Sequence, residues 1–387
     1  MGKYRWKLPI LCIILFVCVR YFVYRQADLN TAVPTSPHGG KAEIVTTVNY
    51  FAQISDNSKI MHNGTLIREL NGQQPKLNTV VPVLPQGGKV DIVSNSNSSV
   101  HSSDTSKMRH NGTLSIAIIG RLGNQMFQYA SILGLADMMN FTQIAIDGGQ
   151  DLLSSFQLSD KRVNFTRIST KWRTINELLC CAFDKRLTQF NNTEDVHVNG
   201  YLVSTKYFHN IKKHIKNEFK FVPRILTEAK IIKNDIAKQF NVTGINYTYI
   251  GVHVRRGDFL EKRNIEAGHF TVTKEFITRA LQMCTKMFGN DTIFVFSSNG
   301  MDWVKYNFNN DTNLKMAFLE GNPAAVDMAV LSLCDHSIVS TGSYGWWAAW
   351  LAGGTTIISK QQAINESFLD KQFVYSEYFP PKWVILD

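Results

Sequence analysis

Short apolar runs alternate with segments of helical spacing from about residue 114 to the end of the chain. Residues 249–254 form an apolar run typical of a buried strand, and residues 274–288 carry apolar positions at helical spacing. The same alternation predicts strands at 114–119, 292–297, 314–319, 337–340 and 355–359, and helices at 124–139, 300–308, 324–334 and 343–352. Strands that alternate with helices form βαβ units, so we expect an α/β fold with parallel sheets.

The pattern is weaker between residues 150 and 239. The simplest architecture is two α/β halves that face a cleft. We place the first half at residues 114–245 and the second at residues 246–387.

The first 113 residues follow different patterns. Residues 8–24 are apolar apart from Pro9 and Arg20, and basic residues lie on both sides. This length is at the lower limit of a membrane-spanning helix. A cleaved signal peptide is the alternative, but no small-residue cleavage site follows. We expect a cytoplasmic tail at 1–7 and an uncleaved signal anchor at 8–24, in the thin membranes of the early secretory pathway.

Residues 25–113 are polar and contain a tandem repeat. Leu29-Asn30-Thr31 returns at 77–79, and the segment 62–66 returns at 110–114, a spacing of 48 residues. Two copies are too few for a solenoid. We expect a flexible stem, with a small folded module as the alternative.

Asn-x-Ser/Thr sequences support a luminal body. Eleven occur in the chain, and each marks a candidate N-glycosylation site. They begin at Asn63, Asn97, Asn111, Asn140, Asn164, Asn191, Asn241, Asn246, Asn290, Asn310 and Asn365.

Charge and cysteine content narrow the ligand classes. The net charge is +10, but the basic residues form no run of five, so a nucleic-acid surface is not favoured. A smaller anionic ligand agrees with the charge. The six cysteines include no C-x-x-C pair, which argues against a structural zinc.

Residues 120–125, with the sequence GRLGNQ, follow a predicted strand and open a predicted helix. Glycines there let backbone N–H groups approach an anion at the helix N-terminus. The spacing is not that of a dinucleotide fingerprint. A plain strand–turn–helix connection is the alternative.

A second motif, His253-Val254-Arg255-Arg256-Gly257-Asp258, ends a predicted strand. Ligands of α/β sheets bind at such strand ends. Side chains alternate along a strand, so the two arginines should point to opposite faces. One arginine can then bind phosphate while a carboxylate pairs with the other arginine. Surface ion pairing is the alternative.

The third motif extends from Asp327 to residue 354 and includes a glycine- and hydroxyl-rich loop at 341–345. The loop precedes a predicted helix, a second arrangement suited to phosphate. Trp346, Trp347 and Trp350 are at helical spacing, which favours core packing over sugar stacking. No D-x-D pair occurs in the chain, so we expect arginines and helix dipoles, not a metal, to neutralise a diphosphate.

Together these motifs resemble the galactoside α-1,2-fucosyltransferases from about residue 115 to the C-terminus. The similarity rests on GRLGNQMFQYA, GVHVRRGD, SSNGMDW, STGSYGWWAAWLAGG and YFPPKW. It implies two Rossmann-like, GT-B-like halves, the N-terminal one on the acceptor side and the C-terminal one binding GDP-fucose as the donor substrate. It also implies no cofactor or metal, and the 2-hydroxyl of a terminal β-galactose as the acceptor. It also implies transfer with inversion by a single-pass type II enzyme of the Golgi membrane.

The resemblance also implies roles for individual residues. Arg255 should contact the β-phosphate, and the loop of Thr341, Gly342, Ser343 and Tyr344 should cap it. Asp327 should accept hydrogen bonds from guanine, with His253 on the base edge. Arg121 and Asn124 should lie near the fucose, and Asp258 should position Arg256, which we also place at the catalytic centre.

The general base stays open at this point. Glu266 resembles the base of the α-1,6 enzymes only if three residues are inserted, and Glu261 and Asp258 are alternatives. Two other functions also stay open: a protein O- or α-1,6-fucosyltransferase, and an inactive, membrane-anchored glycan-binding relative.

Overall fold

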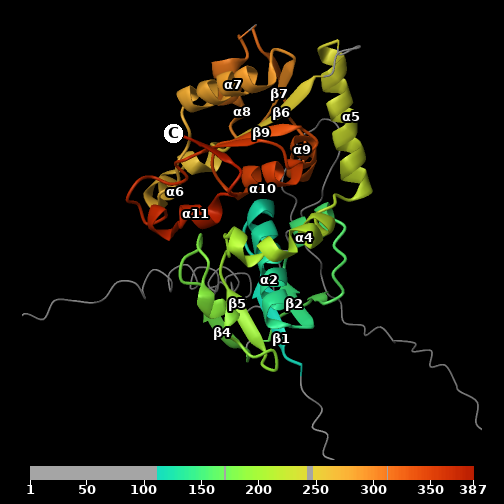
Figure 1. Ribbon diagram of the computed structural model, residues 1–387, viewed down its shortest axis with the longest axis vertical. Coiled ribbons are helices and arrows are strands. Elements are labelled where there is room, and N and C mark those ends of the chain that lie inside the picture. The colour runs from blue at the N-terminus through green and yellow to red at the C-terminus, as the bar shows by residue number, and fades with distance from the viewer. Residues whose placement is uncertain (1–110, 170, 242–246, 312) are drawn as a thin grey trace, which may run out of the picture. The chain divides into compact units, whose positions relative to one another are not determined.

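The computed structural model describes residues 111–169, 171–241, 247–311 and 313–387 (Figure 1). These residues belong to one compact unit, Ser98–Asp387. The expected cytoplasmic tail, anchor and stem repeat lie outside the described residues, apart from the last few positions of the repeat. Within the described part, no helix has both the length and the apolar character to cross a membrane.

The N-terminal lobe is built on a parallel sheet in the order β3-β2-β1-β5-β4. Its strands are β1 (Thr113–Ala117), β2 (Gln143–Asp147), β3 (Val163–Phe165), β4 (Arg173–Asn176) and β5 (Val196–Asn199). The helices of this part of the chain are α2 (Leu122–Met139), α3 (Gln150–Ser155), α4 (Lys212–Glu218) and α5 (Pro223–Gln239), with 3₁₀ turns η1 (Lys185–Thr188), η2 (Thr205–Tyr207) and η3 (His209–Ile211).

The C-terminal lobe contains a second parallel sheet, in the order β11-β10-β9-β6-β7-β8. Its strands are β6 (Thr248–Val254), β7 (Thr292–Ser298), β8 (Lys315–Phe318), β9 (His336–Val339), β10 (Thr356–Ser359) and β11 (Val384–Leu386). Its helices are α6 (Lys262–Ala267), α7 (Lys274–Phe288), α8 (Met301–Phe308), α9 (Ala324–Ser332), α10 (Ser343–Ala352) and α11 (Tyr375–Tyr378), with 3₁₀ turns η4 (Gly257–Leu260) and η5 (Asp370–Gln372).

The two parallel sheets confirm the predicted α/β architecture, and the strongest periodic segments are placed correctly. Helices α7 and α10 have the predicted bounds. Strands β3, β4 and β5 fall in the stretch where the pattern was weak, because they are short and β3 and β4 include no fully buried residue.

One hydrophobic core joins the lobes through α2 and α10. Trp346 and Trp347 on α10 are completely buried, which confirms that these tryptophans pack in the core. The Phe127 ring on α2 lies 4.7 Å from the Trp346 ring and 5.0 Å from the Trp347 ring. At Gly123 a Cβ would lie 2.6 Å from the backbone nitrogen of Tyr344, so only glycine permits this approach of the two helices.

Segments near both ends of the C-terminal lobe cross the division at residue 245. Helix α5 precedes it in sequence but packs against α9 of the C-terminal lobe (Figure 1). After β10 the chain returns to the N-terminal lobe, where Phe373 forms a β-bridge with Cys181. Glu377 of α11 pairs with Lys206 at 2.7 Å. The lobes are therefore interlocked rather than joined by a single linker.

Sequon asparagines in the described part are exposed, as glycosylation requires. These are Asn111, Asn140, Asn164, Asn191, Asn241, Asn290, Asn310 and Asn365. Asn63, Asn97 and Asn246 lie outside the described residues.

Candidate active site

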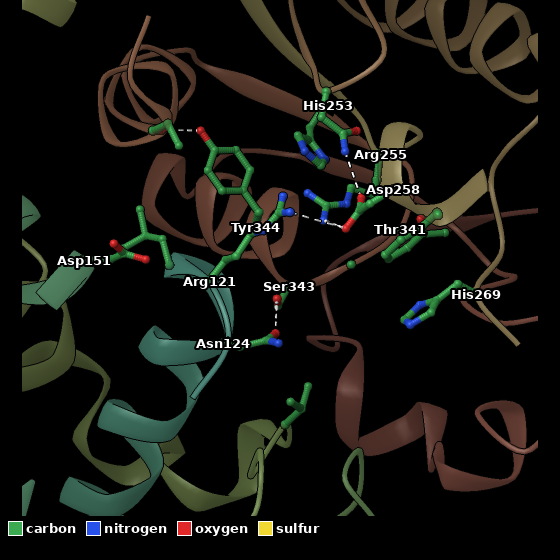
Figure 2. Close-up of a pocket in the computed structure, with 18 of the residues that line it drawn as sticks. Arg121, Asn124, Asp151, His253, Arg255, Asp258, His269, Thr341, Ser343 and Tyr344 are labelled. Carbon is green, nitrogen blue, oxygen red and sulfur yellow. Dashed lines mark hydrogen bonds and ion pairs between the residues drawn. The ribbon is translucent and has the colours of Figure 1, made fainter. Parts of the chain in front are cut away.

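A cavity of about 840 Å³ lies where loops of both lobes meet (Figure 2). Loops after β1 and β2 line it from the N-terminal lobe, and loops after β6, β7, β8 and β9 line it from the C-terminal lobe. These loops follow the carboxyl ends of parallel strands, where α/β proteins bind their ligands.

Two helix N-termini meet at this cavity. Helix α2 follows Gly120, with φ +82°, and α10 follows Gly342, with φ +86°, a left-handed backbone region that favours glycine. The Ser343 hydroxyl donates a hydrogen bond to the Asn124 side chain across the gap. The first N–H groups of a helix lack partners within the helix and mark the positive end of its dipole. The arrangement suits a bound anion.

Arg255 adds a fixed positive charge. Its Nη2 donates to the Asp258 carboxylate at 2.8 Å, and its backbone N–H donates to Ser340 Oγ at 2.8 Å. Burial and the nearby Arg121 lower the pKa of Arg255, and Asp258 opposes them. Arg121 lies 3.9 Å from the same carboxylate. Asp258 thus holds the Arg255 guanidinium at the cavity, and the Arg121 guanidinium lies close to the same carboxylate.

Arg256 lies outside the cavity lining, as was expected for one of the two arginines, although both follow the last residue of β6 rather than lying within the strand. Its guanidinium lies 4.1 Å from the centre of the Trp303 ring. Asp258 was expected to position Arg256, but its carboxylate binds Arg255 and Asn299 instead. The turn after β6 places the Asp258 carboxylate against Arg255, so the expected pairing of Asp258 with Arg256 was wrong. Arg256 does not line the cavity and is not placed to act on a ligand there.

Another end of the cavity is polar and largely buried. The Asp327 carboxylate accepts hydrogen bonds from Ser297 Oγ at 2.8 Å and from Asn322 Nδ2 at 3.0 Å. Burial raises the pKa of Asp327, and the two hydrogen bonds oppose that rise. Each carboxylate oxygen can accept more than one hydrogen bond, so Asp327 retains capacity for a ligand donor.

His253 lies beside this end of the cavity. Burial, assisted by Arg255, lowers the pKa of His253 to about 3, so its ring is neutral. The ring packs 5.1 Å from the Tyr344 ring, and a Cβ at Gly345 would lie 2.3 Å from Nδ1. Nδ1 has no hydrogen-bond partner among the described residues.

Thr341 also lines the cavity, although its hydroxyl is engaged with the backbone of Phe270 at 3.1 Å. Tyr344 lines it too and donates its hydroxyl to the carbonyl of Ala324. The motif residues His253, Arg255, Asp327 and the 341–344 loop are therefore brought together with Arg121 and Asn124.

Glu266 and Glu261, two of the expected candidates for a general base, are not at the cavity. The Glu266 side chain is 66% exposed and lies 3.9 Å from Lys262. Glu261 pairs with Arg263 at 2.8 Å. The short helix α6 turns Glu266 toward solvent, outside the cavity lining.

Other cavity residues were not anticipated from the sequence. His269, between α6 and α7, lies in the lining, with its ring 4.2 Å from the Phe259 ring. Asp151, near the start of α3, accepts from Gln125 Nε2 at 3.0 Å. Asp151 follows a strand of the N-terminal sheet, a signal that was available, whereas no sequence signal separates His269 from other loop histidines.

No group of three or more metal-ligating side chains occurs in the part of the chain that the structure describes. The positive charge at the cavity is supplied by the arginines and helix ends described above.

Comparison with known proteins agrees with this site. The model of glycosyl transferase family 11 matches residues 80–387. Galactoside alpha-(1,2)-fucosyltransferase 2 of Sus scrofa is 31% identical over 277 residues, which cover 70% of this chain and 78% of the relative. Galactoside alpha-(1,2)-fucosyltransferase 1 of Rattus norvegicus is 30% identical over 276 residues, which cover 68% and 70%.

Among solved structures, a mutant of Arabidopsis thaliana FUT1 in complex with GDP has a TM-score of 0.42 and 12% identity, over 67% of this chain and 72% of that chain. A likeness at this level does not bear on the site. The family match at residues 80–387 includes the loops that line the cavity. On this evidence the chain belongs to glycosyl transferase family 11.

Proposed function

We propose that this protein transfers L-fucose from GDP-fucose to the 2-hydroxyl of a terminal β-galactose, with inversion at the fucose C1 and without a metal ion. The observation that carries the proposal is the arrangement of Arg255, held by Asp258, opposite the N-termini of α2 and α10. Membership of a family whose curated relatives are named galactoside α-1,2-fucosyltransferases supplies the donor and acceptor classes.

The donor lies along the C-terminal lobe in this proposal. Guanine presents N–H donors to Asp327, which agrees with the free acceptor capacity of this carboxylate. Neutral His253 lies at the base edge. The diphosphate contacts Arg255 and the Ser343 loop, and the guanidinium fork of Arg255 matches two phosphate oxygens. Arg121 and Asn124 approach from the N-terminal lobe, near the fucose.

The reaction is a single displacement. The galactose O2 forms a bond to the fucose C1 while the bond from C1 to the β-phosphate oxygen breaks, and GDP leaves with the electron pair. Negative charge grows on the β-phosphate as the bond breaks. Arg255 and the first-turn N–H groups of α10 are fixed before the reaction, so they stabilise that charge without rearrangement. This is the role that a metal ion would otherwise fill.

We also propose that the body faces the Golgi lumen behind an uncleaved anchor at residues 8–24. The polar stem and the exposed asparagines of the Asn-x-Ser/Thr sites support a luminal position. The acceptors are then glycoproteins and glycolipids that end in β-galactose.

The test is a transfer assay with the full chain in detergent micelles. GDP-fucose is supplied with lactose, type 1, type 2 and xylose-bearing acceptors, with and without excess EDTA. We expect fucose on the galactose 2-hydroxyl, no product from the matched 2-deoxygalactoside, and an unchanged rate in EDTA.

Different products would contradict the proposal in different ways. Fucose on a serine, threonine or core N-acetylglucosamine would indicate a protein O- or α-1,6-fucosyltransferase. Glycan binding without any transfer would indicate an inactive relative. Loss of transfer in EDTA, restored by Mn²⁺, would contradict the metal-free mechanism alone.

A further inference from the structure

The order of strands in the C-terminal sheet gives the cavity a direction. Asn322 in the loop after β8 and Asp327 in the following helix α9 lie at one end, and Arg255 follows the central strand β6. Thr341 after β9 and Gln362 after β10 line the cavity on the other side of Arg255. Neighbouring strands lie about 4.8 Å apart. A nucleotide with its base near Asp327 and its phosphates at Arg255 therefore directs its sugar toward β9 and β10.

His269 lies at that sugar-side end. It forms a β-bridge with Ala363, which follows β10, and its backbone N–H donates to Asn264 at 2.9 Å. The ring is set against Phe259. In Figure 2 the ring points into the cavity, on the opposite side of Ser343 from Asp151.

The His269 ring has no hydrogen-bond partner of its own. Neither ring nitrogen takes part in a hydrogen bond or ion pair among the described residues, although both its backbone and its ring face are held. Burial lowers the pKa of His269, Asp258 acts to raise it, and Arg255 acts to lower it. The imidazole is therefore neutral near pH 7 and has a nitrogen lone pair free to accept a proton.

Other titratable groups of the cavity are less well placed. The Asp258 carboxylate pairs with the Arg255 guanidinium at 2.8 Å and also accepts from Asn299, so its charge is committed to holding that arginine. His253 is enclosed at the nucleobase end. Asp151 is the remaining competitor, but it extends from the N-terminal lobe and is held by Gln125.

We propose that His269 is the general base that accepts the proton of the acceptor hydroxyl. This rests on the proposed fucosyl transfer. As the galactose O2 bonds to the fucose C1 and GDP departs, the O2 proton moves to a ring nitrogen of His269. The imidazolium then releases the proton to water, so the atoms and charges balance over one turnover.

The first experiment compares steady-state kinetics of the full chain with those of His269→Gln. General-base catalysis contributes a factor of about 10² or more, so kcat should fall by about a hundredfold. GDP binding, measured by calorimetry, should stay within about twofold, because the diphosphate is held by Arg255. Added imidazole should restore part of the rate of His269→Ala.

His336→Gln is the matched control. His336 also stacks on a phenylalanine, with its ring 3.9 Å from the Phe288 ring, and burial likewise lowers its pKa. It lies outside the active-site cavity. The His336 Nδ1 also accepts a hydrogen bond from the Thr355 backbone at 3.0 Å, so we expect a change in melting temperature at least as large as that of His269→Gln. The kcat should not change, which separates the loss of a histidine–phenylalanine stack from the loss of a base.

The pH profile of the wild-type enzyme gives a test that does not depend on any variant folding. Activity should fall as the pH decreases through the pKa of His269, because protonation removes the lone pair, and this limb should be absent in His269→Gln. An unchanged kcat and acid limb in His269→Gln would overturn the proposal, as would transfer of both effects to Asp151→Asn. A wild-type rate that is flat toward acid would do the same. Absence of transfer by the wild type to any galactoside would instead overturn the proposed function.

Discussion

The two lobes use their carboxylates in different ways. In the N-terminal lobe, Glu218 is completely buried and accepts hydrogen bonds from Tyr129 at 2.6 Å and from Ser159. Burial alone would raise the pKa of Glu218, and these hydrogen bonds outweigh it, so the pKa lies below its usual range. In the C-terminal lobe, Asp258 and Asp327 line the cavity. Carboxylates closed by protein donors stabilise the fold, whereas those left open to a cavity are available to a ligand.

This contrast indicates a division of labour. The C-terminal lobe holds most of the charged groups for the donor, and the N-terminal lobe adds Arg121 and Asp151 to the cavity lining while it encloses Glu218 in its own interior. The shared core of α2 and α10 fixes the two lobes against each other. Variants in each region should therefore separate stability from donor binding.

The largest expected effect is at the junction of the lobes. Trp347→Ala removes a buried ring that lies 5.0 Å from Phe127 and 5.5 Å from Phe208. A buried tryptophan replaced by alanine costs about 3–5 kcal/mol, so the free energy of unfolding measured in urea should fall by that amount. Trp347→Phe should lose much less. A loss below about 1 kcal/mol for the alanine variant would show that the lobes do not depend on this core.

The next effect concerns pH and the N-terminal lobe alone. Burial raises the pKa of Glu177 to about 8, although N–H groups of Leu202 and Tyr201 lower it in part. The folded state thus binds this proton more tightly than the unfolded chain does. Its stabilising contribution is present below the unfolded pKa, near 4.5, and is lost as the pH rises through 8.

The measurement is the free energy of unfolding between pH 4.5 and 8.5. We expect a loss on the order of 4 kcal/mol from this group, since its pKa rises from 4.5 to about 8 and one pKa unit corresponds to about 1.4 kcal/mol. Glu177→Gln should flatten this part of the curve without changing GDP binding. An equally steep curve in the variant would assign the pH dependence to other groups.

Arg255→Lys should cost less free energy than the two changes above, but that loss falls on catalytic activity rather than on stability. Lysine supplies a point charge in place of the planar fork. Loss of one charge-assisted contact costs about 1.5–3 kcal/mol, or roughly ten- to a hundredfold in kcat/KM for GDP-fucose. The melting temperature should change little. Near-normal kcat/KM in a well-folded variant would remove this residue from the phosphate site.

The smallest effect on stability and activity is expected for a substitution of Arg256, the neighbour of Arg255. Arg256→Gln removes the cation stacked on Trp303 and should cost about 1 kcal/mol of stability. Donor kcat/KM should stay within about twofold, since the side chain does not line the cavity. A strong kinetic defect with unchanged stability would reverse the roles of the two arginines.

The C-terminal lobe was the more predictable of the two because its central strands are buried on both faces and helix α7 is strongly amphipathic. Phe276, Ile277 and Ala280 on α7, for example, share one buried stripe. Strands such as β4 are half exposed and read as loop. The return of Phe373 to Cys181 spans the whole body, and no local pattern encodes it.

The site was predictable where glycines and arginines follow strands, as at residues 120–125 and 253–258. Prediction of the site failed where a side chain's position depends on the direction in which a short helix or turn leaves the strand. Spacing along the chain could not tell that α6 directs Glu266 to solvent while His269, three residues later, reaches the cavity. Nor could it show that Asp258 folds back onto Arg255 rather than Arg256.

The central claim is that Arg255 binds the β-phosphate of the donor at the edge of the C-terminal sheet. Calorimetric titration of GDP and GMP into the wild type and into Arg255→Lys tests it most directly, because GMP lacks the β-phosphate. We predict that the variant binds GDP about tenfold more weakly, a change of about 1.4 kcal/mol, while its affinity for GMP stays within about twofold. An equal loss for both nucleotides, or no loss for GDP, would contradict the account.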